Sequence, residues 1–206
     1  MKKIIAILLV LVVGFAAFAA VGDATLTLNS TVAGQLYHGF TSSTYTTGAA
    51  LKTAFTTGGE DGDESLTVDF AEENAQAVGY YNFYTTGNFT ATVDLTLSPL
   101  SYSDGTSTYY VPYTLGYTAA NDGASGAGSI AFAAGTKSFA SAAVSTTAIA
   151  DVTVDDIFTA NGAGLRWRSI GLTVDFDATD IDEFGLPETA SGQSFTGTII
   201  AAVTAE

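Results

Sequence analysis

Few residues of this chain have the chemistry that an active site needs. His38 is the single histidine, and the chain has no cysteine. A Ser-His-Asp site needs a histidine that is held by a carboxylate and faces a serine, and no G-x-S-x-G motif accompanies His38. A catalytic zinc site usually takes more than one histidine. We therefore expect His38 to be a turn or loop histidine between aromatic residues, in a protein that is not an enzyme.

Two clusters of acidic residues are the other candidates for a site. The run 60–64 reads Glu-Asp-Gly-Asp-Glu, and the run 175–183 holds five acids in nine residues. Calcium takes about six to eight oxygen ligands, but neither cluster has the D-x-[DN]-x-[DN]-G spacing of a calcium loop. A glycosidase needs two carboxylates in a cleft, and the single Trp gives little support for a sugar cleft. We expect solvated surface here, with no metal and no cofactor, and bound calcium is the alternative.

The overall charge excludes one class of partner. The chain has 6 Lys+Arg against 21 Asp+Glu, which gives a net charge of −15. Nucleic-acid binding requires clustered Lys and Arg to neutralise phosphates, so we expect no nucleic-acid partner. Arg166 and Arg168 are two of the few cations, and we expect them to form surface ion pairs with the many acids.

The start of the chain resembles an export signal. A basic start, Met1-Lys2-Lys3, precedes an apolar run from Ile4 to Phe18, and small residues end at Ala19. This layout predicts a cleaved secretory signal peptide over residues 1–19. The apolar run is 15 residues long, shorter than the roughly 20 that a spanning helix needs. We expect a mature protein in the periplasm, on the cell surface or outside the cell, with no membrane-spanning segment after cleavage.

The elements of the mature chain follow from its hydrophobic period. Apolar and polar residues alternate over 89–97, 109–117 and 195–203, and Pro112 makes the second an edge or bulged strand. Gly-, Ser- and acid-containing turns separate the strands, and helix-forming residues are scarce. This pattern predicts an all-β fold, an Ig-like antiparallel β-sandwich of about seven to nine strands. We assign it to residues 34–206 as a single domain.

One predicted strand changes its parity. Leu165 and Trp167 share one face, whereas the apolar residues beyond Ser169 have the opposite parity. A shift of one residue turns every following side chain to the other face of a sheet. We therefore predict a β-bulge near Ser169 or Gly171.

Three stretches of the sequence resemble a known family. The alternating stretch ATLTLNSTV follows the signal, the middle reads YYVPYTLGYTA, and the end reads LPETASGQSFTGTIIAAVTAE. Together they resemble the Ig-like subunits of bacterial surface fibres of the chaperone–usher route, including fimbrial subunits and relatives of spore coat protein U. Two features depart from that family. The chain has no cysteine for the disulfide of many such subunits, and it ends in Thr204-Ala205-Glu206 without a nearby aromatic residue.

The resemblance implies a mode of assembly. The sandwich of each such subunit lacks one strand, and the N-terminal extension of the next subunit fills the groove by β-augmentation. In this chain the donor would be the N-terminal extension 20–33. The side chains that would enter successive pockets are Ala24, Leu26, Leu28, Ser30 and Val32. The implied partners are other copies of this chain or other fibre subunits, together with a periplasmic chaperone.

The sequence therefore predicts an exported structural or adhesive subunit of a bacterial surface fibre. Two alternatives stay open. Residues 20–33 can instead be the first strand of their own sheet, packed in cis. The chain can also be a monomeric secreted or periplasmic β-sandwich that binds a sugar or a peptide, with calcium at the acidic loops.

Overall fold

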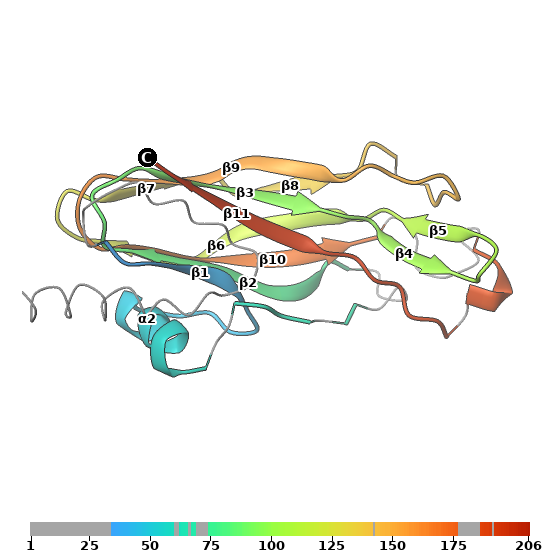
Figure 1. The fold of residues 1–206 in the computed structure, drawn as a ribbon, viewed down its shortest axis with the longest axis horizontal. Coiled ribbons are helices and arrows are strands. Elements are labelled where there is room, and N and C mark those ends of the chain that lie inside the picture. The colour runs from blue at the N-terminus through green and yellow to red at the C-terminus, as the bar shows by residue number, and fades with distance from the viewer. Residues whose placement is uncertain are drawn as a thin grey trace, which may run out of the picture.

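Two antiparallel sheets packed face to face make up most of the protein (Figure 1). The structure, a computed structural model, describes residues 34–59, 62–65, 67–68, 74–141, 143–176, 186–190 and 192–206. The predicted signal peptide and the predicted donor segment 20–33 lie outside the described residues.

Within each sheet, most neighbouring strands are far apart in the sequence. The larger sheet has the order β1 (Leu36–Thr41), β2 (Gln76–Thr85), β10 (Arg166–Asp175), β6 (Thr114–Ala124) and β8 (Gly135–Ser138). The smaller sheet has the order β11 (Ile199–Ala205), β3 (Ala91–Leu97), β9 (Val152–Asn161) and β7 (Ser129–Phe132). A hairpin of β4 (Leu100–Ser103) and β5 (Thr108–Val111), helix α2 (Gly48–Thr57) and a short 3-10 helix (Glu188–Ala190) complete the described part. The predicted antiparallel β-sandwich is confirmed, with five strands in one sheet and four in the other.

Strand β3 shows how the alternating pattern makes the core. Ala91, Val93, Leu95 and Leu97 are all 0% exposed, and the residues between them are half-buried on the outer face. Because successive side chains of a strand point to opposite faces, the odd-numbered residues all point at the other sheet. The predicted core face of this strand is confirmed.

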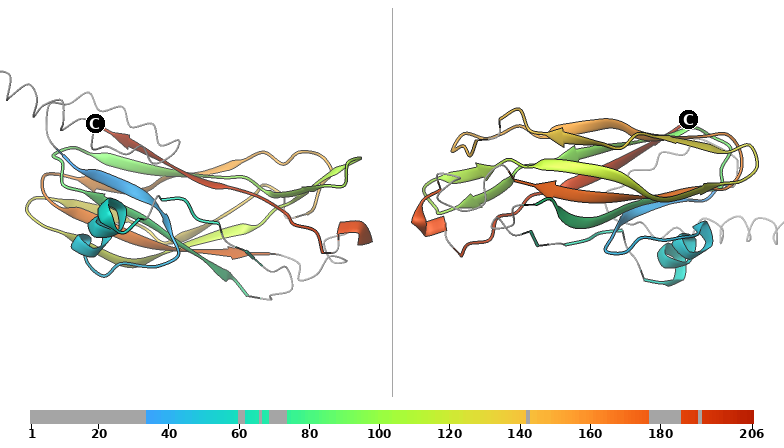
Figure 2. Two further views of the ribbon diagram at one scale, coloured as in Figure 1. Left: turned by 60° about the horizontal axis from the view of Figure 1, so that its bottom comes forward. Right: turned by 180° about the vertical axis from the view of Figure 1, so that it is seen from behind.

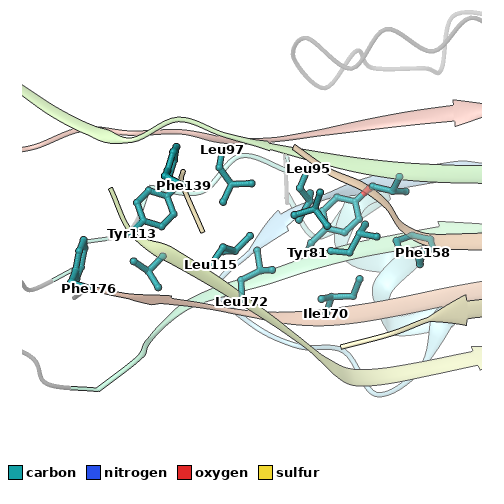
Figure 3. Close-up of a cluster of buried hydrophobic side chains, with 14 of the residues drawn as sticks. Tyr81, Leu95, Leu97, Tyr113, Leu115, Phe139, Phe158, Ile170, Leu172 and Phe176 are labelled. Atoms are coloured by element: carbon teal, nitrogen blue, oxygen red, sulfur yellow. The ribbon is translucent and has the colours of Figure 1, made fainter. Parts of the chain in front are cut away.

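Aromatic rings fill the space between the sheets (Figure 3). Phe83 of β2 and Phe158 of β9 meet edge to face with their centroids 4.9 Å apart. Near the opposite end of the core, Tyr113 meets Phe139 in the same way at 5.2 Å. Edge-to-face rings at these distances pair the positive edge of one ring with the negative face of the other. The Phe83–Phe158 pair joins the two sheets, whereas Tyr113 and Phe139 lie beside the neighbouring strands β6 and β8 of the larger sheet.

The predicted strand 109–117 is wrong in one respect, because it is two strands. Strand β5 ends at Val111, and β6 begins at Thr114 and pairs in the larger sheet instead. Proline has no N–H to donate to a ladder, so Pro112 separates the two strands. The alternation continues across the break because Val111, Tyr113 and Leu115 all face the core.

Register shifts occur where the sequence predicts a β-bulge, but the extra residues lie in the partner strands β6 and β2 and not in β10. The pairing of β10 with β6 shifts between Ser169 and Ile170. The pairing of β10 with β2 shifts between Gly171 and Thr173. Trp167 and Ile170 point to opposite faces because they are three residues apart in a regular strand.

Helix α2 was not predicted, and it covers the outer face of the larger sheet (Figures 1 and 2). Thr47 caps it by accepting a hydrogen bond from the Ala50 N–H, 3.2 Å away. Its buried Leu51 packs with Tyr84 and Trp167 on the outward side of β2 and β10. A Cβ atom on Gly48 would lie 2.6 Å from the Trp167 ring, so the helix docks where only glycine fits.

A buried polar network links β1, β2 and β10, and its Ser169 Oγ also accepts a hydrogen bond from the Tyr45 N–H of the loop before the helix at 3.4 Å. The Asn82 amide donates to Thr41 Oγ1 at 2.7 Å, and the Ser169 hydroxyl donates to the Asn82 side-chain oxygen. All three residues are 0% exposed. Buried polar groups are costly unless they are hydrogen-bonded, so this network makes the placement of the loop specific.

Candidate functional site

The most unusual surface of the described structure is the outer edge of β11. Its seven residues, Ile199–Ala205, read IIAAVTA and contain no charge, no proline and no glycine. Strand β3 pairs with one side of β11, and no described strand pairs with the other side. Natural proteins usually protect edge strands with charges, proline or bulges. The described part of the chain provides none of these on β11, which makes the edge a ready template for another strand.

The hydrogen-bonding groups of this edge can be assigned from the register. Glu206 and Thr90 exchange both backbone hydrogen bonds, at 2.9 and 3.0 Å. In an antiparallel pair, hydrogen-bonded and non-bonded positions alternate. The even-numbered residues of β11 therefore bond to β3, and the odd-numbered residues point their N–H and C=O groups to the outer edge.

The side chains of β11 follow the same alternation. Ile199, Ala201, Val203 and Ala205 face the core and are only half-buried, although their partners across β3 are fully buried. Ile200 on the outer face is 56% exposed, and it is the large exposed hydrophobic residue of the described structure. The odd-numbered residues thus combine an unused backbone edge with incompletely covered apolar side chains.

A hollow of about 150 Å³ opens between the sheets beside this edge. Apolar side chains of both sheets line it, among them Phe40, Val78, Leu172, Val174 and Ile199. Glu64 is the charged residue among its described lining. The hollow has the size of one large aliphatic side chain, and Ile199 connects it to the open edge of β11.

The facing edge, β1, is covered at its C-terminal end. The Phe40 N–H donates to the Gly62 carbonyl at 2.8 Å, and the Ser42 N–H donates to Glu64 Oε1 at 2.8 Å. A Cβ atom on Gly39 would lie 2.4 Å from Gly62, so the two backbones are in close contact. Residues 62–64 therefore use the outer edge of β1 for hydrogen bonding.

The predicted donor residues are not placed by the structure. Ala24, Leu26, Leu28, Ser30 and Val32 lie outside the described residues. The residue that follows this segment is placed, because Gly34 lies against Gly87 and Phe89 at one end of the sandwich. The open edge of β11, in contrast, is not among the residues that the sequence predicts as a site. The uncharged run at the chain end was visible there, but its position at a sheet edge depends on long-range pairing.

His38 has a structural environment and lies in a strand, so the expected loop position is wrong. Its Nδ1 atom is hydrogen-bonded to the Tyr81 hydroxyl at 3.2 Å, and the two rings pack 6.1 Å apart. Burial lowers the pKa of His38 from 6.5 to about 4 and raises the pKa of Tyr81 well above its usual value. A catalytic histidine has its ring nitrogens shared between a carboxylate and a nucleophile, and here Tyr81 occupies one of them.

Only parts of the two acidic clusters lie within the described residues. Asp175 is exposed at the end of β10, and residues 60, 61 and 177–185 lie outside the described residues. In the described ranges no three His, Asp or Glu side chains gather as metal ligands would. Asp104 instead shapes the β4–β5 turn, where its Oδ1 accepts from the Thr106 and Ser107 N–H groups at 2.8 Å each. These bonds to Ser107 and Thr106 lower the pKa of Asp104.

Arg166 and Arg168 are both buried. The expected surface ion pair is wrong for Arg166, and for Arg168 it is only one of the contacts that the side chain makes. Arg166 is 0% exposed and donates to the backbone carbonyls of Gly87 and Phe89, with its guanidinium over the Phe89 ring. Arg168 does pair with Asp122, and it also lies over the Phe132 ring. Burial lowers the pKa of both guanidinium groups. Arg166 therefore ties the 87–89 loop to the end of the sandwich.

Comparison of the chain with protein-family models, with curated proteins and with solved structures yields no match. Within the described residues, no helix is long and apolar enough to cross a membrane. The fold and the open edge of β11 are therefore the observations on which a function can be argued.

Proposed function

We propose that the protein is an exported structural subunit of a bacterial surface fibre that assembles by β-strand addition. The acceptor is the outer edge of β11 together with the hollow beside Ile199. The donor is the extension 20–33 of another copy or of a related subunit. The role is structural or adhesive, and the proposal includes no cofactor.

The unprotected edge of β11 is the observation that carries this proposal. A seven-residue edge without charge or proline exposes a monomer to uncontrolled association. Strand addition uses the same feature, because backbone hydrogen bonds supply affinity and pockets for alternate side chains supply specificity. The outward N–H and C=O groups of the odd-numbered residues and the half-covered apolar row beneath them meet both requirements.

The donor segment has matching chemistry. Residues 24–33 are uncharged, and their apolar positions alternate with Thr and Asn. Burying Leu26, Leu28 and Val32 contributes roughly 1.5–3 kcal/mol for each side chain. The cost of ordering the extension offsets part of this gain.

Removal of the donor segment tests the proposal. Protein that lacks residues 20–33 should fail to form the high-mass species that the exported protein forms, as measured by size-exclusion chromatography with light scattering. A synthetic 20–33 peptide should bind the truncated protein, and the same peptide with Leu28→Asp should bind at least tenfold more weakly. Exported protein that stays monomeric at high concentration, with no peptide binding after truncation, would remove the fibre role and favour a monomeric binding module.

A further inference from the structure

The chain enters the described structure beside the end of β11. A Cβ atom on Gly34 would lie 2.8 Å from the Gly87 Cα and 3.2 Å from the Phe89 ring. The next residue, Gln35, accepts a backbone hydrogen bond from Thr86 at 3.0 Å. Only glycine allows this contact between backbones, so the position of the chain at residue 34 is fixed by packing.

The last residue of the chain lies at the same end of the sandwich. Glu206 pairs with Thr90, a few residues from the Gly87–Phe89 contact of Gly34. Figures 1 and 2 show the start of β1 and the C-terminus at one end of the molecule. Any segment that leads into Gly34 therefore arrives next to the C-terminal end of β11.

We propose that residues 26–32 lie along the outer edge of β11 of their own chain, parallel to it, before any assembly takes place. This proposal rests on the acceptor edge of the proposed function and gives that edge a resting occupant. The direction follows from the position of Gly34. A segment that ends beside Ala205 and lies along β11 must begin beside Ile199, and it then runs in the same direction as β11.

The length and the parity of the segment fit this arrangement. Strand β11 has seven residues, about 23 Å at roughly 3.3 Å per residue, and residues 26–32 are also seven. The apolar face of the segment has even numbers, and the core face of β11 has odd numbers. Neighbouring residues on adjacent strands share a face, so an arrangement that ends with Val32 beside Ala205 places Leu26 beside Ile199.

Side-chain sizes are complementary in this register. Leu28 lies beside the small Ala201, and the small Ser30 lies beside Val203. Leu26 lies beside Ile199, which lines the apolar hollow between the sheets. Three of the four pairs in this register thus combine a large residue with a small one, as close packing favours.

In this arrangement, residues 26–41 pass from the smaller sheet to the larger sheet. The segment adds to the smaller sheet, turns at Gly34 and continues as β1 in the larger sheet. A chain that covers its own edge does not assemble. Fibre growth then proceeds by exchange of this identical segment between copies, with the Gly34 region as the hinge, as in domain swapping.

The absence of cysteine from the chain makes a cross-linking test clean. Two double variants carry cysteines on the outward faces of the segment and of β11. Thr31→Cys with Thr204→Cys joins positions that the proposed register makes neighbours. Thr27→Cys with Thr204→Cys is the matched control, because four residues along a strand displace it by about 13 Å, beyond the roughly 7 Å Cα separation of a disulfide.

The expected result is an intramolecular disulfide in most molecules of the first variant under mild oxidation, and in few of the control. It is read from the mass and from the faster mobility of a monomer on non-reducing gels. The oxidised protein should not assemble, and reduction should restore assembly.

Two other outcomes overturn the inference. Disulfides found only between molecules would leave strand addition in place but show that the segment does not cover its own edge. A more efficient cross-link in the control than in the first variant would exclude the parallel register. An intramolecular cross-link in a protein that never assembles after reduction would support the cis arrangement and remove the fibre function instead.

Discussion

The two flanks of the sandwich end in strands of opposite character. On one flank the sheets end in β8 and β7, which have four residues each, and β8 carries Lys137. On the other flank the smaller sheet ends in β11, which has seven residues and no charge. Short strands and lysines are the usual means of keeping an edge from pairing with another chain. One flank is therefore protected, and the other leaves a long uncharged edge without a described partner strand.

The difference shows where function can be located in a protein without a catalytic cluster. Both flanks share one core, so the burial of apolar residues does not distinguish them. The flanks differ in two ways. The outer N–H and C=O groups of β11 have no described partner strand, and its core-facing residues are only half-buried, with Ile199 lining the hollow. The function is therefore expected at a backbone edge, where single side chains matter less than the pattern of the strand.

The largest effect is expected from a charge in the shared core. Val93→Asp places an uncompensated carboxylate at a 0% exposed position and should cost about 4 kcal/mol or more of unfolding free energy. Thr92→Asp, on the outer face of the same strand, should cost less than about 1 kcal/mol. Urea denaturation of both proteins checks this. Equal tolerance would contradict the placement of the core.

The next effect separates the flanks directly. Val203→Lys and Ile130→Lys each put a lysine at a half-buried, core-facing position on an edge strand of the smaller sheet. Both should cost about 1–2 kcal/mol of stability, because the lysine stem can still extend to water. Only Val203→Lys should reduce assembly, by at least tenfold in light scattering. Equal loss of assembly in both proteins would mean that the flanks are not functionally distinct.

A further effect, which is seen only as pH falls, concerns β1, the edge strand of the larger sheet. Burial lowers the pKa of His38 from its ordinary value of 6.5 to about 4 in the folded protein, so the unfolded chain binds a proton first as pH falls. Stability from this group is complete above about pH 6.5 and declines towards pH 4, by about 1–3 kcal/mol after allowance for partial exposure. His38→Gln should reduce this decline in urea midpoints measured across the range. An unchanged pH dependence would show that other groups produce it.

The alternation of apolar and polar residues was enough to predict some of the strands and their core faces. The core face of β3 and the positions of the register shifts beside β10 were predicted from the side-chain period, whereas the strand that carries each extra residue depends on long-range pairing. Helix α2 escaped prediction because it is short, and its docking depends on Trp167, which is distant in the sequence. The burial of Arg166 and Arg168 was missed for a similar reason, since the carbonyls that bind Arg166 belong to the 87–89 loop. The position of a strand at the edge of a sheet depends on pairing across the whole chain. The alternation of β11 therefore did not predict that its outer edge lacks a described partner strand.

The central claim is that a strand adds to the outer edge of β11, and amide hydrogen exchange tests it most directly. The N–H groups of Ile200, Ala202 and Thr204 bond to β3 in every state and serve as internal controls. The N–H groups of Ala201 and Val203 point to the outer edge. We predict that these two amides are protected in the full mature protein, exchange rapidly once residues 20–33 are removed, and regain protection when the 20–33 peptide is added. Rapid exchange of these two amides in the full protein and in its assembled form, beside protected neighbours, would contradict the account.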